Sequence, residues 1–333
     1  MKNLEMNQFK VSVVIPVRNE EVYIKKCIES IFSQDYPKDS FEIIFVDGNS
    51  EDNTADIIKS YITEENHLRL LNNPHKFVQH GLNIGIKAAV GEYIVRMDAH
   101  SQYEKDYISK SVEYLEKTNA SDVGGQMVAV GETKLQKVIA AAYHSDFALG
   151  GGKNHAKDYE GYADTVFLGA FKRQEILDMG LYDERLIRNE DDDLAFRMIE
   201  KGLKIFMTPE IKSKYYPRSK YSDLFKQYFE YGMWKVAVIK KHGRPARISH
   251  LVPMLFVAFL VLFSVGSFFF KEIFWIFTVV MSIYLLLNLY FSFKNDGAPK
   301  ISDKLMLMLV HFILHISYGS GFWVGIFKFW NFK

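Results

Sequence analysis

The sequence contains a single cysteine, Cys27, so neither an intrachain disulfide nor a zinc site built from cysteines is possible. The net charge is only +1, which argues against a nucleic-acid-binding protein that works through bulk electrostatics. Residues 1–10 also lack an apolar segment, so we expect no cleavable signal peptide. The region that follows is therefore expected to stay in the compartment where it is made.

The composition is that of a folded protein, with 48% hydrophobic and 15% aromatic residues. The acidic residues lie mostly in the first two thirds of the chain, and the last third is almost entirely apolar. This asymmetry predicts two domains, a water-exposed one over residues 1–245 and a membrane domain over residues 246–333.

Short apolar runs alternate with helical patterns over the first hundred residues. The runs VSVVIP, FEIIFV, LRLL and EYIVRM are typical of buried strands, and the segments between them carry apolar residues at helical spacing. Repeated strand–helix–strand units predict an α/β fold with a mostly parallel sheet and helices on both faces. Ligands bind such sheets beyond the carboxyl ends of the strands, where Asp47 and Asp98 follow directly.

Three long apolar segments follow the water-exposed region. Residues 251–270 carry no charge, residues 273–293 form a second such run, and residues 305–330 form a third that contains histidines and glycines. The first two are long enough to cross a bilayer, which disfavours buried core helices. The third either spans the membrane or lies in its interface, and the sequence leaves both open.

Basic residues cluster just before the first apolar segment: Lys235, Lys240, Lys241, Arg244 and Arg247. The positive-inside rule places this end, and everything before it, on the cytoplasmic side. We therefore expect a multi-pass protein of the inner (plasma) membrane with the lipid bilayer as a partner. The oligomeric state is unknown.

Four consecutive acids, Glu190 to Asp193, stand in NEDDDLAFR. One or two acids at a helix N-terminus stabilise it by about 0.3–1 kcal/mol, but four exceed that role. Asp193 and Arg197 can pair at i and i+4, which leaves Glu190, Asp191 and Asp192 with only Arg188 as a nearby cation. Such clusters commonly perform metal binding or proton transfer.

These acids meet the chemical needs of sugar transfer from a nucleotide diphosphate. Departure of the diphosphate requires a divalent cation, and Asp98 and His100, two residues apart at a strand end, could hold Mg²⁺ or Mn²⁺. The acceptor hydroxyl needs a base, and repulsion in an acidic cluster raises a carboxyl pKa toward that role. Simpler interpretations remain: Asp47 as a turn residue and Asp98 as a helix cap.

Several ordered motifs resemble the inverting glycosyltransferases of family 2, which have the GT-A nucleotide-diphospho-sugar transferase fold. VSVVIPVRNEEVYIKKCIESIFSQDYP is similar to the family's opening strand and helix, IIFVDGNSEDNT to its nucleotide-binding turn, and GEYIVRMDAH to its metal-binding strand end. NEDDDLAFR resembles the catalytic helix, and QYFEYGMWK the helix before the membrane. The nearest resemblance is to membrane-anchored exopolysaccharide glucosyltransferases of the succinoglycan type.

The resemblance implies a role for each matching position. The catalytic residues would be Asp191, as the base, and Glu190. The nucleotide-sugar pocket would comprise Pro16, Arg18, Glu20, Asp47, Asp98 and Gly169. Asp192, Gln227 and Trp234 would contact the acceptor or diphosphate. Asp98 and His100 would hold the divalent metal, Mg²⁺ or Mn²⁺.

The chain departs from the family pattern at three places. The usual Asp-x-Asp is Asp98-Ala99-His100, and the usual aspartate pair after the second strand is Asp47-Gly48. Glu230 stands where many relatives have arginine. These changes concern the second metal ligand, the uracil contact and the phosphate clamp respectively.

The function implied by the resemblance is inverting transfer of a sugar, with glucose expected, from a UDP-sugar to a polyprenyl-linked glycan at the cytoplasmic membrane face, in exopolysaccharide or cell-surface glycan synthesis. An alternative is a synthase that charges polyprenyl phosphate with a hexose, and a more distant one is an inactive membrane-tethered nucleotide-binding protein. A dinucleotide oxidoreductase is disfavoured, because PVRNE follows the first strand instead of a glycine-rich turn. No nucleic-acid partner is expected.

Overall fold

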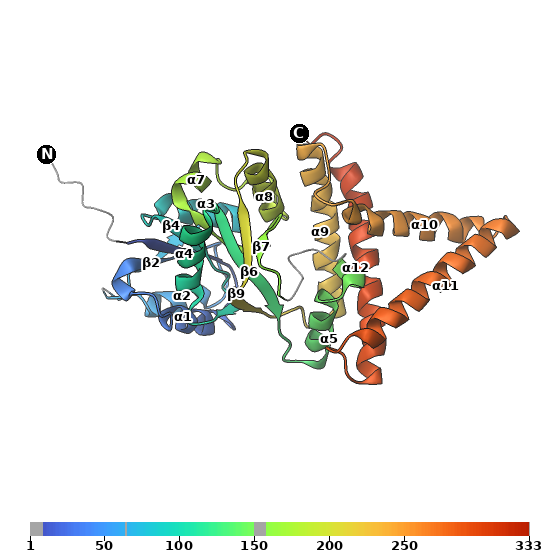
Figure 1. Cartoon of the computed structure of the whole chain (residues 1–333), viewed down its shortest axis with the longest axis horizontal. Helices are drawn as coiled ribbons and strands as arrows, with labels where there is room; N and C mark the ends of the chain where they lie inside the picture. The colour runs from blue at the N-terminus through green and yellow to red at the C-terminus, as the bar shows by residue number, and fades with distance from the viewer. Residues whose placement is uncertain (1–8, 64, 150–157, 333) are drawn as a thin grey trace. The chain divides into compact units, whose positions relative to one another are not determined.

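The computed structural model describes residues 9–63, 65–149 and 158–332, and the chain forms two compact units (Figure 1). The first unit draws on residues 1–128 and 156–215, and the second on residues 129–155 and 216–333. The expected membrane boundary near residue 245 stays a prediction. The second unit is larger than the three apolar segments, since it also takes residues 129–155 and 216–245.

Four parallel strands form the first half of the sheet. They are β1 (Val11–Val17), β2 (Phe41–Asp47), β3 (Leu68–Asn72) and β4 (Tyr93–Arg96), and β1 lies between β2 and β4. β1 and most of β2 are buried, as their continuous apolar runs predict. Asp47 pairs with Val17, so the carboxyl ends of β2 and β1 meet at one edge of the sheet, where Met97 and Asp98 also leave β4.

The second half of the sheet is antiparallel. β8 (Phe167–Lys172) pairs with β4 and β6 (Asp122–Ala129), and β9 (Ile205–Tyr215) pairs with β5 (Ser101–Tyr103) and β7 (Gly161–Tyr162). The strand order is β3-β2-β1-β4-β8-β6-β9-β5. The α/β architecture expected from the sequence is confirmed, with a mixed sheet.

Helices cover both faces of the sheet and bury separate apolar cores, because alternate residues of each strand face opposite sides. One core takes Val13 and Phe45 together with α1 (Ile24–Phe32), α2 (Thr54–Ser60) and α4 (Tyr107–Thr118). The other takes Val14 and Ile44 together with α3 (Val78–Ala88), α7 (Arg173–Asp178) and α8 (Glu190–Glu200). Cys27 is fully buried in the first core.

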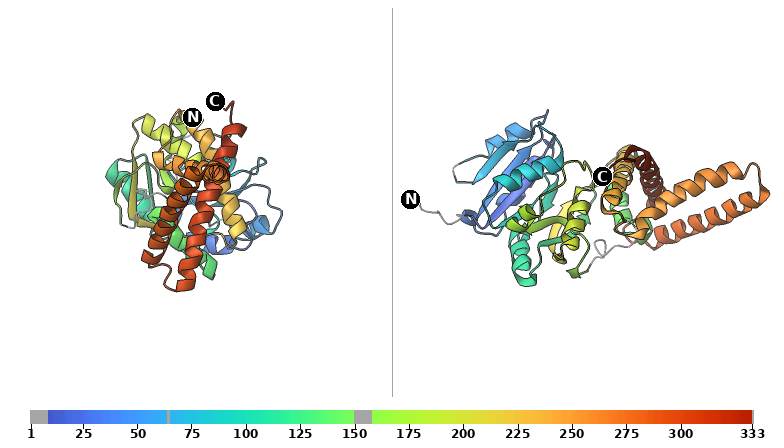
Figure 2. Two further views of the ribbon diagram at one scale, coloured as in Figure 1. Left: turned by 90° about the vertical axis from the view of Figure 1, so that its right-hand side faces the viewer. Right: turned by 90° about the horizontal axis from the view of Figure 1, so that it is seen from above.

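Helices make up the second unit. They are α5 (Lys134–Tyr143), α6 (Asp146–Leu149), α9 (Tyr221–His242), α10 (Val252–Gly266), α11 (Lys271–Lys294) and α12 (Ile301–Lys328), with a short 3₁₀ turn, η3 (Ile248–Leu251), before α10. Three of these segments, residues 248–266, 271–294 and 301–328, are long and apolar enough to cross a membrane. α10 and α11 form an antiparallel hairpin, seen from above in Figure 2.

Helix α5 was not expected from the sequence, where periodicity weakens after residue 130. Its start carries a complete capping box: Thr133 accepts a hydrogen bond from the Gln136 backbone N–H, and the Gln136 side chain accepts one from Thr133. The T-x-x-Q spacing was therefore a readable helix signal.

Candidate active site

The loops after β1 and β2 interlock around Asp47. The Asp47 carboxylate accepts hydrogen bonds from the Ser50 hydroxyl at 2.6 Å and the Ser50 backbone N–H at 3.2 Å. The Ser50 hydroxyl in turn accepts one from the Asn19 backbone N–H, and Asn19 accepts one from Glu51. Asp47 thus shapes the turn it begins, and its contact with a nucleobase stays a prediction.

Residues 16–20 leave the end of β1 between the other two strand ends. The Glu20 backbone N–H donates to Thr54 at 2.8 Å, and its carboxylate lies 3.3 Å from Nδ1 of His100. Arg18 lies 3.7 Å from Glu51, and Pro16 is buried against Gly81 of α3. The predicted pocket residues of this loop therefore link the Asp47 turn to the segment that follows β4.

Arg96, the last residue of β4, is the centre of a charged cluster that the sequence did not predict. Its guanidinium forms an ion pair with Asp191, lies 3.7 Å from Asp98 and stands over the Tyr182 ring at 5.8 Å. Burial would lower the pKa of Arg96, but Asp191 and Asp98 outweigh it and keep the group charged. The expectation that only Arg188 could neutralise the acidic run was wrong, because Arg96 approaches from 95 residues away.

The four acids at the start of α8 fall into different environments. Glu190 is buried and Asp193 completely so, whereas the Asp191 side chain is 47% exposed. Burial, together with the charge of Asp191, raises the pKa of Glu190 to about 8, so it is protonated at neutral pH. Partial desolvation raises the pKa of Asp191 as well, and Arg96 opposes that rise. Asp192 is half-buried.

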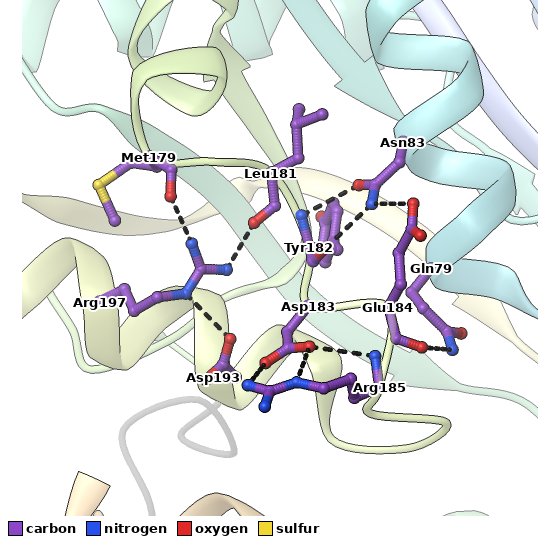
Figure 3. A network of polar contacts seen from close by, with 10 residues as sticks. All are labelled: Gln79, Asn83, Met179, Leu181, Tyr182, Asp183, Glu184, Arg185, Asp193 and Arg197. Carbon is purple, nitrogen blue, oxygen red and sulfur yellow. Dashed lines mark hydrogen bonds and ion pairs between the residues drawn. The ribbon is translucent and has the colours of Figure 1, made fainter. Parts of the chain in front are cut away.

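Asp193 has the structural role that its spacing predicted. Its carboxylate accepts a hydrogen bond from Nε of Arg197 at 2.9 Å, and the same guanidinium donates to the carbonyls of Met179 and Leu181 at 2.7 and 2.6 Å (Figure 3). The predicted i, i+4 pair is therefore confirmed. It also fixes the beginning of the segment that leads into α8.

Helix α3 holds the same segment from the opposite side (Figure 3). The Asn83 side chain donates to the Tyr182 carbonyl at 2.9 Å and accepts from the Tyr182 N–H at 3.0 Å, while Gln79 donates to the Glu184 carbonyl at 3.1 Å. Leu181 and Asn189 adopt the left-handed region, with φ of 63° and 61°. Such positions persist only where surrounding contacts determine them, so this network fixes the entry of α8.

Gly169 and Asp122 meet beneath the acidic cluster. A Cβ at Gly169 would lie 2.2 Å from the Asp122 carboxylate, which explains a glycine there on steric grounds. Burial, together with the charge of Asp191, raises the pKa of Asp122 well above its usual range, which favours the neutral form of this carboxyl. Gly169 therefore makes room for a buried acid, and its predicted place in the sugar pocket remains a prediction.

Gln227 and Trp234 lie on α9 in the second unit. Gln227 donates to the Tyr231 hydroxyl at 3.0 Å. Trp234 is 7% exposed, and its ring packs at a tilt against Phe329, with 4.7 Å between ring centres, while the Lys328 ammonium lies 5.4 Å from the Trp234 ring centre. Trp234 has a packing role inside its own unit, and the predicted contacts of both residues with the acceptor or diphosphate remain predictions.

Asp98 and His100 are the predicted ligands of the divalent metal, and this role stays a prediction. Over the described residues there is no cluster of three or more His, Cys, Asp or Glu side chains placed to hold an ion. The Asp98 side chain is 19% exposed at the sheet edge, and the His100 ring is 37% exposed beside Glu20. Oxygen and imidazole donors of this kind would suit Mn²⁺.

Comparison with known proteins was decisive for the family. The model of "Glycosyl transferase family 2" matches residues 12–177, which include nearly all of β1, all of β2 and the Asp98 segment. A relative from Methanococcus voltae, named dolichyl N-acetyl-alpha-D-glucosaminyl phosphate 3-beta-D-2,3-diacetamido-2,3-dideoxy-beta-D-glucuronosyltransferase, is 30% identical over 96% of this chain and 97% of its own. The chain belongs to glycosyl transferase family 2.

Two further proteins are similar to this glycosyltransferase over most of their length. The succinoglycan biosynthesis protein ExoA of Rhizobium meliloti is 27% identical over 97% of both chains. The structure of a mannosyltransferase from Pyrobaculum calidifontis, in complex with GDP-Man and Mn²⁺, superposes with a TM-score of 0.64 at 17% identity and covers 92% of this chain and 86% of its own. The GT-A fold and the assignment as a glycosyltransferase predicted from the sequence are thus confirmed.

Proposed function

We propose that this glycosyltransferase transfers a sugar, with glucose from UDP-glucose as the first candidate, to a lipid-linked saccharide at the cytoplasmic face of the membrane, with inversion at the anomeric carbon. The observation that carries the mechanism is the Arg96 cluster. It joins Asp98, at the end of the sheet where donors bind, to Asp191, at the start of α8.

Asp191 is the group best suited to act as the base. Its side chain is half-exposed, whereas Glu190 is buried and, with its pKa at about 8, carries a proton at neutral pH. Asp191 would accept the proton of the acceptor hydroxyl as the hydroxyl oxygen forms its bond to the anomeric carbon and the bond to the diphosphate breaks. Arg96 fixes the direction of the Asp191 carboxylate and opposes the rise in its pKa.

The donor would occupy the edge formed by residues 16–20, Asp47 and Asp98. Asp98 and His100 are the residues that would hold a divalent cation. When bound, that ion would supply positive charge beside the departing diphosphate. The Pyrobaculum protein was solved with Mn²⁺, which supports this assignment.

The acceptor class is supported by the relatives' names. The Methanococcus enzyme is named for transfer to a sugar on dolichyl phosphate, and the Rhizobium protein for succinoglycan biosynthesis. Three apolar helices suited to a bilayer would keep the enzyme at the surface where such acceptors reside. A polyprenyl-phosphate hexose synthase remains the second candidate, because it needs the same donor site and the same anchor.

The test is a transfer assay with purified protein in detergent. A panel of UDP- and GDP-sugars is offered with polyprenyl phosphate or with a lipid-linked saccharide, and nucleotide release is compared. Release only with the saccharide supports the proposal, and release only with polyprenyl phosphate supports the synthase.

The Asp191→Asn variant tests the base in the same assay. We expect it to lose about 10²–10⁴-fold in turnover while donor affinity is kept, since general-base catalysis contributes on that order. Wild-type turnover in this variant would remove Asp191 as the base.

A further inference from the structure

The third apolar helix, α12, crosses the base of the α10–α11 hairpin instead of running beside it. The hairpin pairs in an antiparallel register: Phe256 stacks on Tyr284 at 4.5 Å, and Phe259 lies 5.7 Å from Phe277. The tip follows at Gly266, whose Cβ position lies 3.0 Å from Ile273. In this register Met254, near the start of α10, lies level with Leu286 of α11.

The first half of α12 contacts the end of α11. Lys304 donates to the Phe293 carbonyl at 2.6 Å, Asn288 donates to the Met308 carbonyl at 3.0 Å, and His315 lies 3.0 Å from the Tyr284 hydroxyl. A helix that continued along α11 in this antiparallel register would bring its residue 323 opposite Ile273, close to the tip of the hairpin.

Trp323 instead lies at the base. Its indole N–H donates to the Met254 carbonyl at 3.0 Å, and a Cβ at Gly319 would lie 2.2 Å from the Pro253 carbonyl. Met254 is level with Leu286, which lies 13 residues from Ile273 along α11. At ~1.5 Å per residue, Trp323 is therefore about 20 Å further from the tip than it would be if α12 ran along α11. α12 therefore advances along α11 only from the level of Phe293 to that of Tyr284, and residue 323 lies no nearer the tip than residue 315 does.

A charged helix lies along the second half of α12. Cβ atoms at Gly321 and Gly325 would lie 2.0 Å from the Phe229 carbonyl and 2.4 Å from the Met233 carbonyl of α9, so the two backbones touch. Further on, Lys240 donates to the Trp330 carbonyl at 2.6 Å. α9 carries six charged residues, which bar it from spanning a bilayer: Asp223, Lys226, Glu230, Lys235, Lys240 and Lys241.

The three helices also differ in how much of their surface is covered by the rest of the protein: α12 is far more covered than α10 and α11. The share of residues that are buried in the most apolar stretch of each segment is 0% for residues 248–266, 6% for residues 271–294 and 44% for residues 301–328. Lipid is the occupant that suits the hairpin, because about 28 Å of helix in residues 248–266 and about 36 Å in α11 match a hydrocarbon layer of ~30 Å. α12 is instead covered by α9 and by α5.

We propose that, among the residues that the structure describes, the α10–α11 hairpin alone crosses the bilayer, and that α12 lies with α9 in the membrane interface. The described part of the chain then has two spans, and the end of α12 returns to the side of the catalytic unit. This inference rests on the proposed membrane attachment and answers the question that the sequence left open for residues 305–330.

The flanking charges give the hairpin its direction. The base carries Lys240, Lys241, Arg244 and Arg247 before α10, Lys294 at the end of α11, and Lys300 and Lys304 after it. The tip carries one cation, Lys271, beside Glu272. The positive-inside rule therefore places the base on the cytoplasmic side and the tip on the other.

Cysteine labelling in sealed vesicles of known orientation tests the proposal. The native Cys27 is buried, so wild-type protein serves as the background control. The positions compared are Asp39→Cys in the catalytic unit, Lys271→Cys at the tip and Asn331→Cys after α12, all exposed. A membrane-impermeant maleimide should label Asp39→Cys and Asn331→Cys from one side only, and Lys271→Cys from the other only.

Each other pattern overturns the proposal. Asn331→Cys labelled from the same side as Lys271→Cys indicates three spans. All three positions labelled from one side indicates a hairpin that does not cross, and labelling of Asn331→Cys only after detergent places it in the hydrocarbon. Labelling needs neither donor nor acceptor. The membrane topology can therefore be confirmed or refuted even if the protein shows no activity in the transfer assay.

Discussion

Replacing Glu190 by glutamine should stabilise the protein in a pH-dependent way. Burial raises the pKa of Glu190 from 4.5 to about 8, so the folded state holds a proton that the unfolded state releases above pH 4.5. The stability that Glu190 contributes is therefore fully present below pH 4.5 and is lost as the pH rises toward 8. At ~1.4 kcal/mol per pH unit, the free energy of unfolding falls by roughly 3 kcal/mol at most between pH 4.5 and pH 7. The fall is smaller if Asp191 takes up part of the same proton, because the two neighbouring carboxyls titrate together.

Glutamine has the shape of the protonated acid and cannot ionise. We expect Glu190→Gln to raise the free energy of unfolding by about 1–3 kcal/mol at pH 7 and by less than about 1 kcal/mol at pH 5. Thermal unfolding in detergent at pH 5, 6, 7 and 8 measures this difference, with Glu200→Gln at the other end of α8 as a matched control. A difference that does not change with pH, or that shrinks as the pH rises, would refute the buried neutral acid.

Three other predictions concern the same unit. Arg96→Lys keeps the charge but loses the planar fork that holds Asp191, so turnover should fall on the order of 10–100-fold, while donor affinity measured by calorimetry changes less. Gly169→Ala places a Cβ against Asp122, and we expect a loss of about 1–3 kcal/mol in thermal unfolding, whereas Gly180→Ala, with open space around it, should act only through its backbone. Chelation by EDTA should abolish nucleotide release and Mn²⁺ should restore it; activity that survives exhaustive chelation would contradict a metal at Asp98.

Local patterns were sufficient for most of the fold and for one part of the site. The strands β1 to β4 and their helices follow from apolar runs and helical spacing, and the Asp193–Arg197 pair follows from residues one helical turn apart. A helix of only ten residues such as α5 was missed, although Thr133 and Gln136 gave a capping signal.

The centre of the site depended on contacts that no local pattern contains. Arg96 and Asp191 are 95 residues apart, and only the sheet brings them together. An arginine inside the apolar run EYIVRM is unusual in a buried strand and could have indicated a buried acidic partner, though not which one. Likewise, hydropathy could not distinguish a spanning α12 from an interfacial one, because its covering helix α9 lies about 90 residues earlier.

The backbone contact between α9 and α12 also sets an order of assembly. Gly321 and Gly325 leave the ribosome about 90 residues after Phe229 and Met233, yet they provide the surface against which those two residues pack. Domains generally fold as they are synthesised, from the N-terminus onward. This glycosyltransferase cannot complete the packing of α9 in that way, because α9 must wait without its partner until α10, α11 and α12 have been synthesised after it.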